Sequence, residues 1–231
     1  MRRRALVLLP LLLVISSYLC AGDVANFVNL GFSQDAETFM FGQYGIDSEE
    51  SKPFAELYAV DVAENVFETD GVKRQTYDVE LSPGMDGSGA LYTLLGDSAS
   101  LVDRYEINHL TPGRIVYLLV NGEEPESSID FRDFNTGNRF QVELVQSKRG
   151  SGDNVRAAFH IQLSVTFADG TVEARTIGLP NYYRDGVSQY RISHIYLGPN
   201  EQSLVFVVQK ERLRESGKTV RYMVETTAID P

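Results

Sequence analysis

A strict alternation of apolar and mostly polar residues at positions 155–167 constrains the fold more than any other stretch of the chain. Successive side chains of a β-strand point to opposite faces, so this pattern predicts a strand with one buried face. Such a strand exceeds the usual length of about 5–6 residues and favours a sandwich or a strongly curved sheet. The apolar members of the pattern are Val155, Ala157, Phe159, Ile161, Leu163, Val165 and Phe167.

The segments on either side of this strand predict an antiparallel meander. Asp169 and Gly170 form a tight-turn pair that leads into a second strand at residues 171–179. A third strand at residues 140–145 is expected on the other side, across a loop at residues 150–154. The centre of the chain is therefore predicted to be a sheet of sequential neighbours.

The two ends of the chain carry similar hairpin patterns. Apolar alternation before and after a turn at residues 33–37 predicts a hairpin, followed by a strand at residues 55–62. Shifting positions by 165 places Ile195 and Leu197 on Leu30 and Phe32. We predict blade-like units at residues 27–63 and 192–228 that neighbour each other.

The hairpin units partly resemble blades of periplasmic β-propellers, in which an apolar strand ends in a Phe-Ser-Pro-Asp-Gly turn. The two copies here read Phe32-Ser33-Gln34-Asp35-Ala36 and Leu197-Gly198-Pro199-Asn200-Glu201. Both lack the turn glycine, and a propeller requires about four or more blades. We therefore rank a sandwich-like or curved antiparallel fold above a propeller-like one.

One helix is expected among the strands, at residues 90–105. Its apolar positions lie mostly along one side, which suits packing on a sheet, although Gly96 costs about 1 kcal/mol relative to Ala in a helix interior. The expected fold class is thus mainly β with one helix.

The beginning of the chain has the pattern of an export signal. Three arginines at positions 2–4 precede a short apolar run and then small residues up to Gly22. We expect cleavage after residue 22 and a single secreted domain at residues 23–231. A lipid anchor at Cys20 is less favoured, because bulky Leu19 precedes it, and simple cleavage would remove the chain's one cysteine.

Charge and hydropathy limit the partners of the exported form. The net charge of the chain is −11, and loss of the three leader arginines lowers it to −14. Such a surface repels nucleic acid and anionic membranes, so neither is an expected partner. We expect no transmembrane helix after the leader is removed. The expected location is periplasmic or secreted.

Residues 23–33 and the closing strand Arg221-Tyr222-Met223-Val224-Glu225-Thr226, together with the export signal, resemble a bacterial family known only as predicted secreted proteins. The resemblance extends over the exported chain. It implies export and one continuous domain, and it brings no known activity, cofactor or catalytic residue.

No catalytic, cofactor or metal site is predicted. Ser98 follows Gly96 and Asp97 as in some secreted esterases, but no histidine follows an Asp by three positions, so we expect Ser98 to be a helix residue near a kink. Glu106 and His109 offer only two ligands of a zinc site, and acidic loops at 47–50, 86–89 and 123–126 lack the spacing of a calcium loop. His160 is expected to be a buried histidine covered by the helix, with a groove-lining position as the alternative.

The most site-like segment is the loop at residues 181–186. It places Tyr182, Tyr183, Arg184 and Asp185 side by side before a glycine. Tyrosine and arginine are enriched in binding surfaces, whereas a loop tyrosine can also anchor the loop in the core. We name these four residues as a candidate binding patch.

The expected function is a non-catalytic binding or envelope-assembly module with a protein or saccharide partner in the envelope. The alternative is a secreted hydrolase or sugar-active enzyme without a linear motif. Two carboxylates facing each other across a cleft, about 5–10 Å apart, would favour the enzyme.

Overall fold

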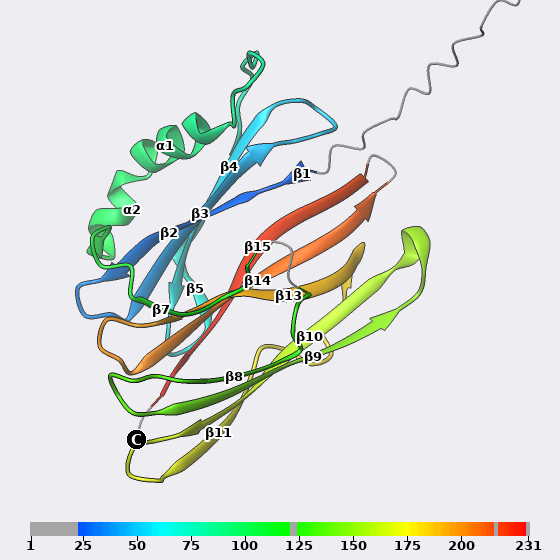
Figure 1. Ribbon diagram of the computed structural model, residues 1–231. Coiled ribbons are helices and arrows are strands. Elements are labelled where there is room, and N and C mark those ends of the chain that lie inside the picture. The colour runs from blue at the N-terminus through cyan, green and yellow to red at the C-terminus, as the bar shows by residue number, and fades with distance from the viewer. Residues whose placement is uncertain (1–22, 121–123, 215–216, 230–231) are drawn as a thin grey trace, which may run out of the picture.

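The computed structural model describes residues 23–120, 124–214 and 217–229, which form three antiparallel-rich sheets and two α-helices (Figure 1). The leader at residues 1–22, including Cys20, lies outside the described residues. None of the described helices is both long and apolar enough to cross a membrane.

The N-terminal sheet has the strand order β5-β4-β3-β2-β6. Its strands are β2 (Asn26–Ser33), β3 (Thr38–Ile46), β4 (Pro53–Asp61), β5 (Val66–Thr76) and β6 (Ile107–Asn108). The predicted first hairpin is confirmed, with Phe32 opposite Phe39. Its turn is held by side chains, because the Ser33 hydroxyl accepts the Thr38 N–H at 2.8 Å and Asp35 accepts the Glu37 N–H at 3.0 Å.

The central sheet has the order β1-β15-β14-β13-β7. Its strands are β1 (Asp23–Val24), β7 (Arg114–Leu118), β13 (Val187–Leu197), β14 (Ser203–Arg214) and β15 (Gly217–Ala228). β1 runs parallel to β15, and the remaining pairs are antiparallel.

The outer sheet contains the predicted meander, which is confirmed as β11-β10-β9-β8. Its strands are β8 (Ser128–Arg132), β9 (Arg139–Arg149), β10 (Arg156–Thr166), β11 (Val172–Ile177) and the short β12 (Arg184–Asp185), and a 3-10 turn (Gly152–Asn154) joins β9 to β10. The alternating residues of β10 bury one face as predicted, with Phe159, Ile161 and Val165 each at most 1% exposed.

The sheets stack in layers with the central sheet in the middle (Figure 1). One hydrophobic core lies between the outer and central sheets, and another lies between the N-terminal and central sheets. Phe140 and Phe159 of the outer sheet pack with Phe206 of the central sheet. Phe39 of the N-terminal sheet packs in another cluster with Val205 and Val207 from the opposite face of β14. The layered arrangement confirms the sandwich-like class that we ranked above a propeller.

Two helices, α1 (Ser88–Asp97) and α2 (Ala99–Arg104), stand where one helix was expected. The chain bends at Ser98, whose backbone leaves the helical region at φ −105° and ψ 18°. Gly96 and Ser98 are both weaker helix formers than Ala, and the bend lets Leu94 and Leu101 pack in the same cluster beside Leu57. The expected single helix is therefore two helices, which meet at the expected kink near Ser98, and the expected packing on a sheet is confirmed.

The two terminal hairpin units face each other across the core between the N-terminal and central sheets. Their registers differ in the third strand. Thr38 lies opposite Asp61 in the N-terminal sheet. With a constant shift of 165, Ser203 would lie opposite residue 226, but it lies opposite Ala228, two residues further along. An even displacement keeps side chains on the same face. The internal repeat stays a prediction.

Candidate functional site

The four residues of the candidate patch contact different neighbours, and their role in binding stays a prediction. Arg184 and Asp185 form β12 against β10, opposite Ala157 and Arg156. Tyr182 is 55% exposed, and the Arg184 guanidinium lies 4.8 Å from the centre of its ring. Tyr183 instead packs with Arg149, 4.0 Å from its ring, and its hydroxyl accepts a hydrogen bond from Ser147. Only Tyr182 and Arg184 border a cavity.

This cavity lies where all three sheets meet. It has a volume of about 640 Å³ and is bordered by β3, β4 and β5 of the N-terminal sheet, by β14 and β15 of the central sheet, and by the segment that enters β12. Its size is typical of a small-molecule site. We call it the three-sheet cavity.

The lining of the three-sheet cavity is strongly basic, although the whole chain is acidic. Among the described residues of this lining, Glu56 is the one carboxylate. The basic side chains are Arg74, Arg184, Lys210, Arg212 and Arg221. A concentration of cations in a chain of net charge −11 is the opposite of what its composition suggests.

Two of these cations are paired within the protein. Arg221 makes a bidentate contact with the buried carboxylate of Asp23, at 2.9 and 2.5 Å, and lies 4.2 Å from the ring centre of Phe54. Arg74 lies 3.7 Å from Glu56, which also accepts hydrogen bonds from Gln43 and Tyr58. Burial, followed by the Glu56 charge, raises the pKa of Tyr58 to about 12, so its hydroxyl stays a donor.

Among the described residues, Lys210, Arg184 and Arg212 form no ion pair with a carboxylate, although the Glu56 charge acts on Lys210 and the Arg184 charge acts on Glu225. The Nε of Arg212 is buried without a hydrogen-bond partner. Burial, and then the neighbouring Arg212 and Arg184, lower the pKa of Lys210 to about 8. Half-buried cations that repel one another are costly, so we take these three, the unpaired cations, as the chemical centre of the cavity.

The sequence of β14 explains why Lys210 and Arg212 both lie at the cavity. Leu204, Phe206 and Val208 point into the core with the outer sheet, and the period of two carries the same face on to Lys210 and Arg212. Sequence reasoning missed both residues. The sequence did contain an indication of their position, because Lys210 and Arg212 continue the alternation of inward-pointing apolar residues along the strand.

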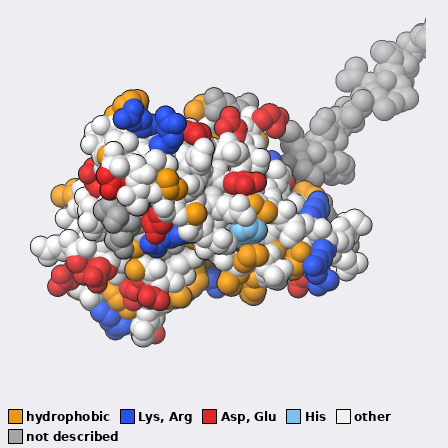
Figure 2. Space-filling model, turned by 90° about the horizontal axis from the view of Figure 1, so that it is seen from below, with side chains coloured by type: hydrophobic (Ala, Val, Ile, Leu, Met, Phe, Trp, Pro, Cys, Tyr) orange, Lys and Arg blue, Asp and Glu red, His pale blue; other side chains and the backbone are white. Residues whose placement is uncertain are grey.

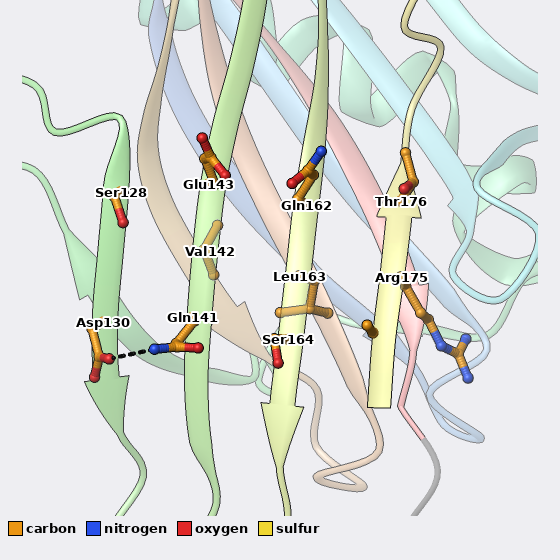
Figure 3. Close-up of a pocket in the computed structure, with 11 residues that line it drawn as sticks. Ser128, Asp130, Gln141, Val142, Glu143, Gln162, Leu163, Ser164, Arg175 and Thr176 are labelled. Atoms are coloured by element: carbon orange, nitrogen blue, oxygen red, sulfur yellow. Dashed lines mark hydrogen bonds between the residues drawn. The ribbon is translucent and has the colours of Figure 1, made fainter. Parts of the chain in front are cut away.

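A second hollow lies on the outward face of the outer sheet (Figure 3). It is an open groove of about 490 Å³ with a polar lining, in which Asp130 accepts a hydrogen bond from Gln141 at 3.2 Å. Asp130 and Glu143 rise from the same sheet face on adjacent strands, since Gln141 lies opposite Asp130 and Ser128 opposite Glu143. They are not opposed across a cleft, as a glycosidase requires.

The surface seen from below carries acidic and basic side chains in small separate groups, with hydrophobic side chains between them (Figure 2). No single charge sign dominates that view. The three-sheet cavity is therefore distinguished by its basic lining, and it holds one carboxylate where the hydrolase hypothesis needs two.

The remaining sequence candidates are structural. Ser98 is buried at the junction of α1 and α2 and has no hydrogen bond to a histidine among the described residues. His109 contacts the Leu30 carbonyl oxygen at 2.6 Å through Nδ1. His160 is half-buried in the outer sheet, whereas the helices pack on the N-terminal sheet, so its expected covering by the helix was wrong.

The acidic loops use their carboxylates within their own turns. Asp47 accepts the N–H groups of Glu49 and Glu50, and Asp86 accepts that of Ser88. Residue 123 of the third loop lies outside the described residues. In the part of the chain that the structure describes, no group of three or more His, Cys, Asp or Glu side chains is placed to hold a metal ion.

Comparisons with known proteins give one finding. A family model described as "Predicted secreted protein (DUF2259)" matches residues 40–228. Neither the curated proteins nor the solved structures contain a match to this chain.

Proposed function

Because the chain belongs to this family of secreted proteins of unknown function, we propose that it is a non-catalytic binding module that acts outside the cytoplasm and holds an anionic group in the three-sheet cavity. The group belongs to a small molecule or to an envelope saccharide or protein. The signal peptide and the periplasmic or extracellular location of the mature form are part of this proposal.

The observation that carries the proposal is the presence of three unpaired cations, Lys210, Arg184 and Arg212, in one cavity. Placing the three charges together costs stability, since each loses hydration and repels the others, although Arg184 also packs on the rings of Phe159, Tyr182 and Tyr190. An anion recovers that cost by forming charge-assisted hydrogen bonds with the guanidinium and ammonium donors. The cavity is thus suited to ligand binding more than to stability.

Catalysis receives less support. The described lining of the three-sheet cavity has a single carboxylate, and Glu56 already accepts bonds from Gln43 and Tyr58. It is therefore poorly available as a general base. The described residues that line the cavity also include no histidine, serine or cysteine.

The test is a calorimetric titration of the purified protein with inorganic phosphate and with citrate. We expect saturable binding of at least one of them, and a loss of affinity of at least tenfold in Arg212→Gln and in Lys210→Met. Arg104→Gln is the matched control, because Arg104 is exposed on α2, is paired with Asp70, and is not part of the cavity lining. Equal affinity in all three variants, or no binding of either anion, would disprove the proposal.

A further inference from the structure

We infer that the ligand is a ring-bearing phosphomonoester whose phosphoryl group lies against Lys210, Arg184 and Arg212 while its ring lies between Phe67 and Tyr182. This inference rests on the proposed function, because it names the ligand class of the same cavity. Three features of the cavity support it: its charge, its aromatic side chains and their relative depth.

The charge of the cavity suits a dianion. After Arg221 has paired with Asp23 and Arg74 has approached Glu56, three positive charges are left. A carboxylate supplies one negative charge, whereas a phosphomonoester supplies about −1.5 to −2 at neutral pH and presents three acceptor oxygens. Arg184 and Arg212 both line the cavity, and their guanidinium groups are donors of the planar type that bind phosphate with two parallel hydrogen bonds.

Two exposed aromatic rings border the same cavity from different walls. Phe67 comes from β5 and is 56% exposed, and Tyr182 comes from the segment before β12 and is 55% exposed. Exposed rings at a cavity are favourable contact surfaces, because they bury large apolar area with little loss of side-chain freedom. A planar or chair-shaped ring has two apolar faces that such side chains can cover.

Both rings are positioned by contacts that exist without a ligand. Phe67 packs 5.5 Å from the Tyr58 ring, and Tyr58 stacks 4.8 Å from Phe41 in the core. Tyr182 is held by the Arg184 guanidinium at 4.8 Å. Because both side chains are already ordered, ligand binding loses little side-chain entropy, and the contacts of the rings with the ligand increase the affinity.

Relative depth orients the ligand. The unpaired cations are half-buried, and the Arg212 Nε is fully covered, whereas the two rings are more than half exposed. A charged group therefore enters first, where lower solvent access strengthens its ion pairs, and the ring stays nearer the opening. Inorganic phosphate would fill only the inner part of this arrangement.

The experiment compares four probes by calorimetry: inorganic phosphate, glucose 6-phosphate, phenyl phosphate and glucose. We expect at least one of the two organic phosphates to bind at least tenfold more tightly than inorganic phosphate, and glucose not to bind. The two organic phosphates distinguish a saccharide ring from an aromatic ring. Phe67→Ala should abolish the gain from the ring and leave the affinity for inorganic phosphate unchanged, and Tyr182→Phe should keep it.

Phe134→Ala is the matched control, since Phe134 is 87% exposed and lies outside the cavity lining. The unfolding temperature of each variant checks that it is folded. If inorganic phosphate binds and neither organic phosphate binds more tightly, the ring inference is wrong and the anion-binding function stands. If citrate binds and no phosphate does, the phosphoryl assignment is wrong. If no anion binds, the proposed function itself fails.

Discussion

At the scale of single residues, Lys210 shows how a binding site can reduce stability. Its pKa is lowered from an ordinary value of 10.5 to about 8, first by burial and then by Arg212 and Arg184. Between these two pH values the unfolded chain binds a proton that the folded chain does not. The free energy of unfolding therefore increases with pH across this window. At pH 7 the lysine is charged in both states, so the full destabilisation by the buried charge is present.

Replacing Lys210 with methionine should therefore stabilise the protein. We expect Lys210→Met to raise the free energy of unfolding at pH 7 by about 1–3 kcal/mol, because it removes a buried cation and keeps most of the side-chain volume. The difference from the original protein should shrink as the pH rises from 8 to 10.5. Urea unfolding at pH 7 and pH 10 measures both effects.

Lys148→Met serves as the control for this change, since Lys148 is exposed on β9. It should alter stability by less than about 0.5 kcal/mol at either pH. A loss of stability at pH 7 in Lys210→Met would mean that the lysine is held by interactions that outweigh its burial, and that it is not an unpaired cation.

At the scale of elements, the free edge of β15 is covered by side chains from the neighbouring sheet. β1 pairs with β15 only at Thr219 and Val220. Beyond them, the Gln43 side chain accepts the Tyr222 N–H at 2.8 Å and donates to the Tyr222 carbonyl at 3.2 Å, as a neighbouring strand would. Asn65 accepts the Thr226 N–H at 2.9 Å. Such covering protects an edge from pairing with another chain.

Removing this cover should both destabilise and expose the edge. We expect Gln43→Leu to lower the free energy of unfolding by about 1–3 kcal/mol, because it leaves the Tyr222 backbone N–H and carbonyl without their side-chain partner and removes one donor from the Glu56 carboxylate. It should also promote association at high protein concentration. Urea unfolding and light scattering after size-exclusion chromatography measure the two effects.

Gln75→Leu is the matched control, because Gln75 is exposed on β5 and bonds only the Thr76 carbonyl. It should change neither property appreciably. If Gln43→Leu remains as stable as the original protein, the side-chain cover contributes nothing to the edge.

The elements also show which features the sequence predicts. β10 could be predicted, because its burial follows the two-residue period of an extended chain. A kink near Ser98 could also be predicted, but the division into two helices could not, since Leu94 and Leu101 are seven residues apart and fit one continuous helix equally well. Of the cavity, sequence reasoning found only Tyr182 and Arg184. Gln43, Glu56 and Lys210 reach it from separate strands, so their meeting depends on how the sheets stack.

At the scale of the whole molecule, β14 of the central sheet is covered on both faces over residues 203–208. Phe206 packs towards the outer sheet and Val207 towards the N-terminal sheet, and both are fully buried. The three-sheet cavity lies at the rim of this stack, so its walls keep their spacing only while both sheet interfaces are intact. The binding site therefore depends on the whole stack, and one continuous domain at residues 23–231 remains our prediction.

This arrangement predicts a single cooperative unfolding transition, because damage to either face of β14 weakens both interfaces. We expect Phe206→Ala to cost about 3–5 kcal/mol and Val207→Ala about 1–3 kcal/mol, each lowering the midpoint of the same transition. Differential scanning calorimetry should give a ratio of calorimetric to van't Hoff enthalpy near one in both variants. Val172→Ala, at a 62% exposed position of β11, should leave the midpoint unchanged. A second transition in Phe206→Ala would instead show that the outer sheet unfolds on its own and that the chain has two domains.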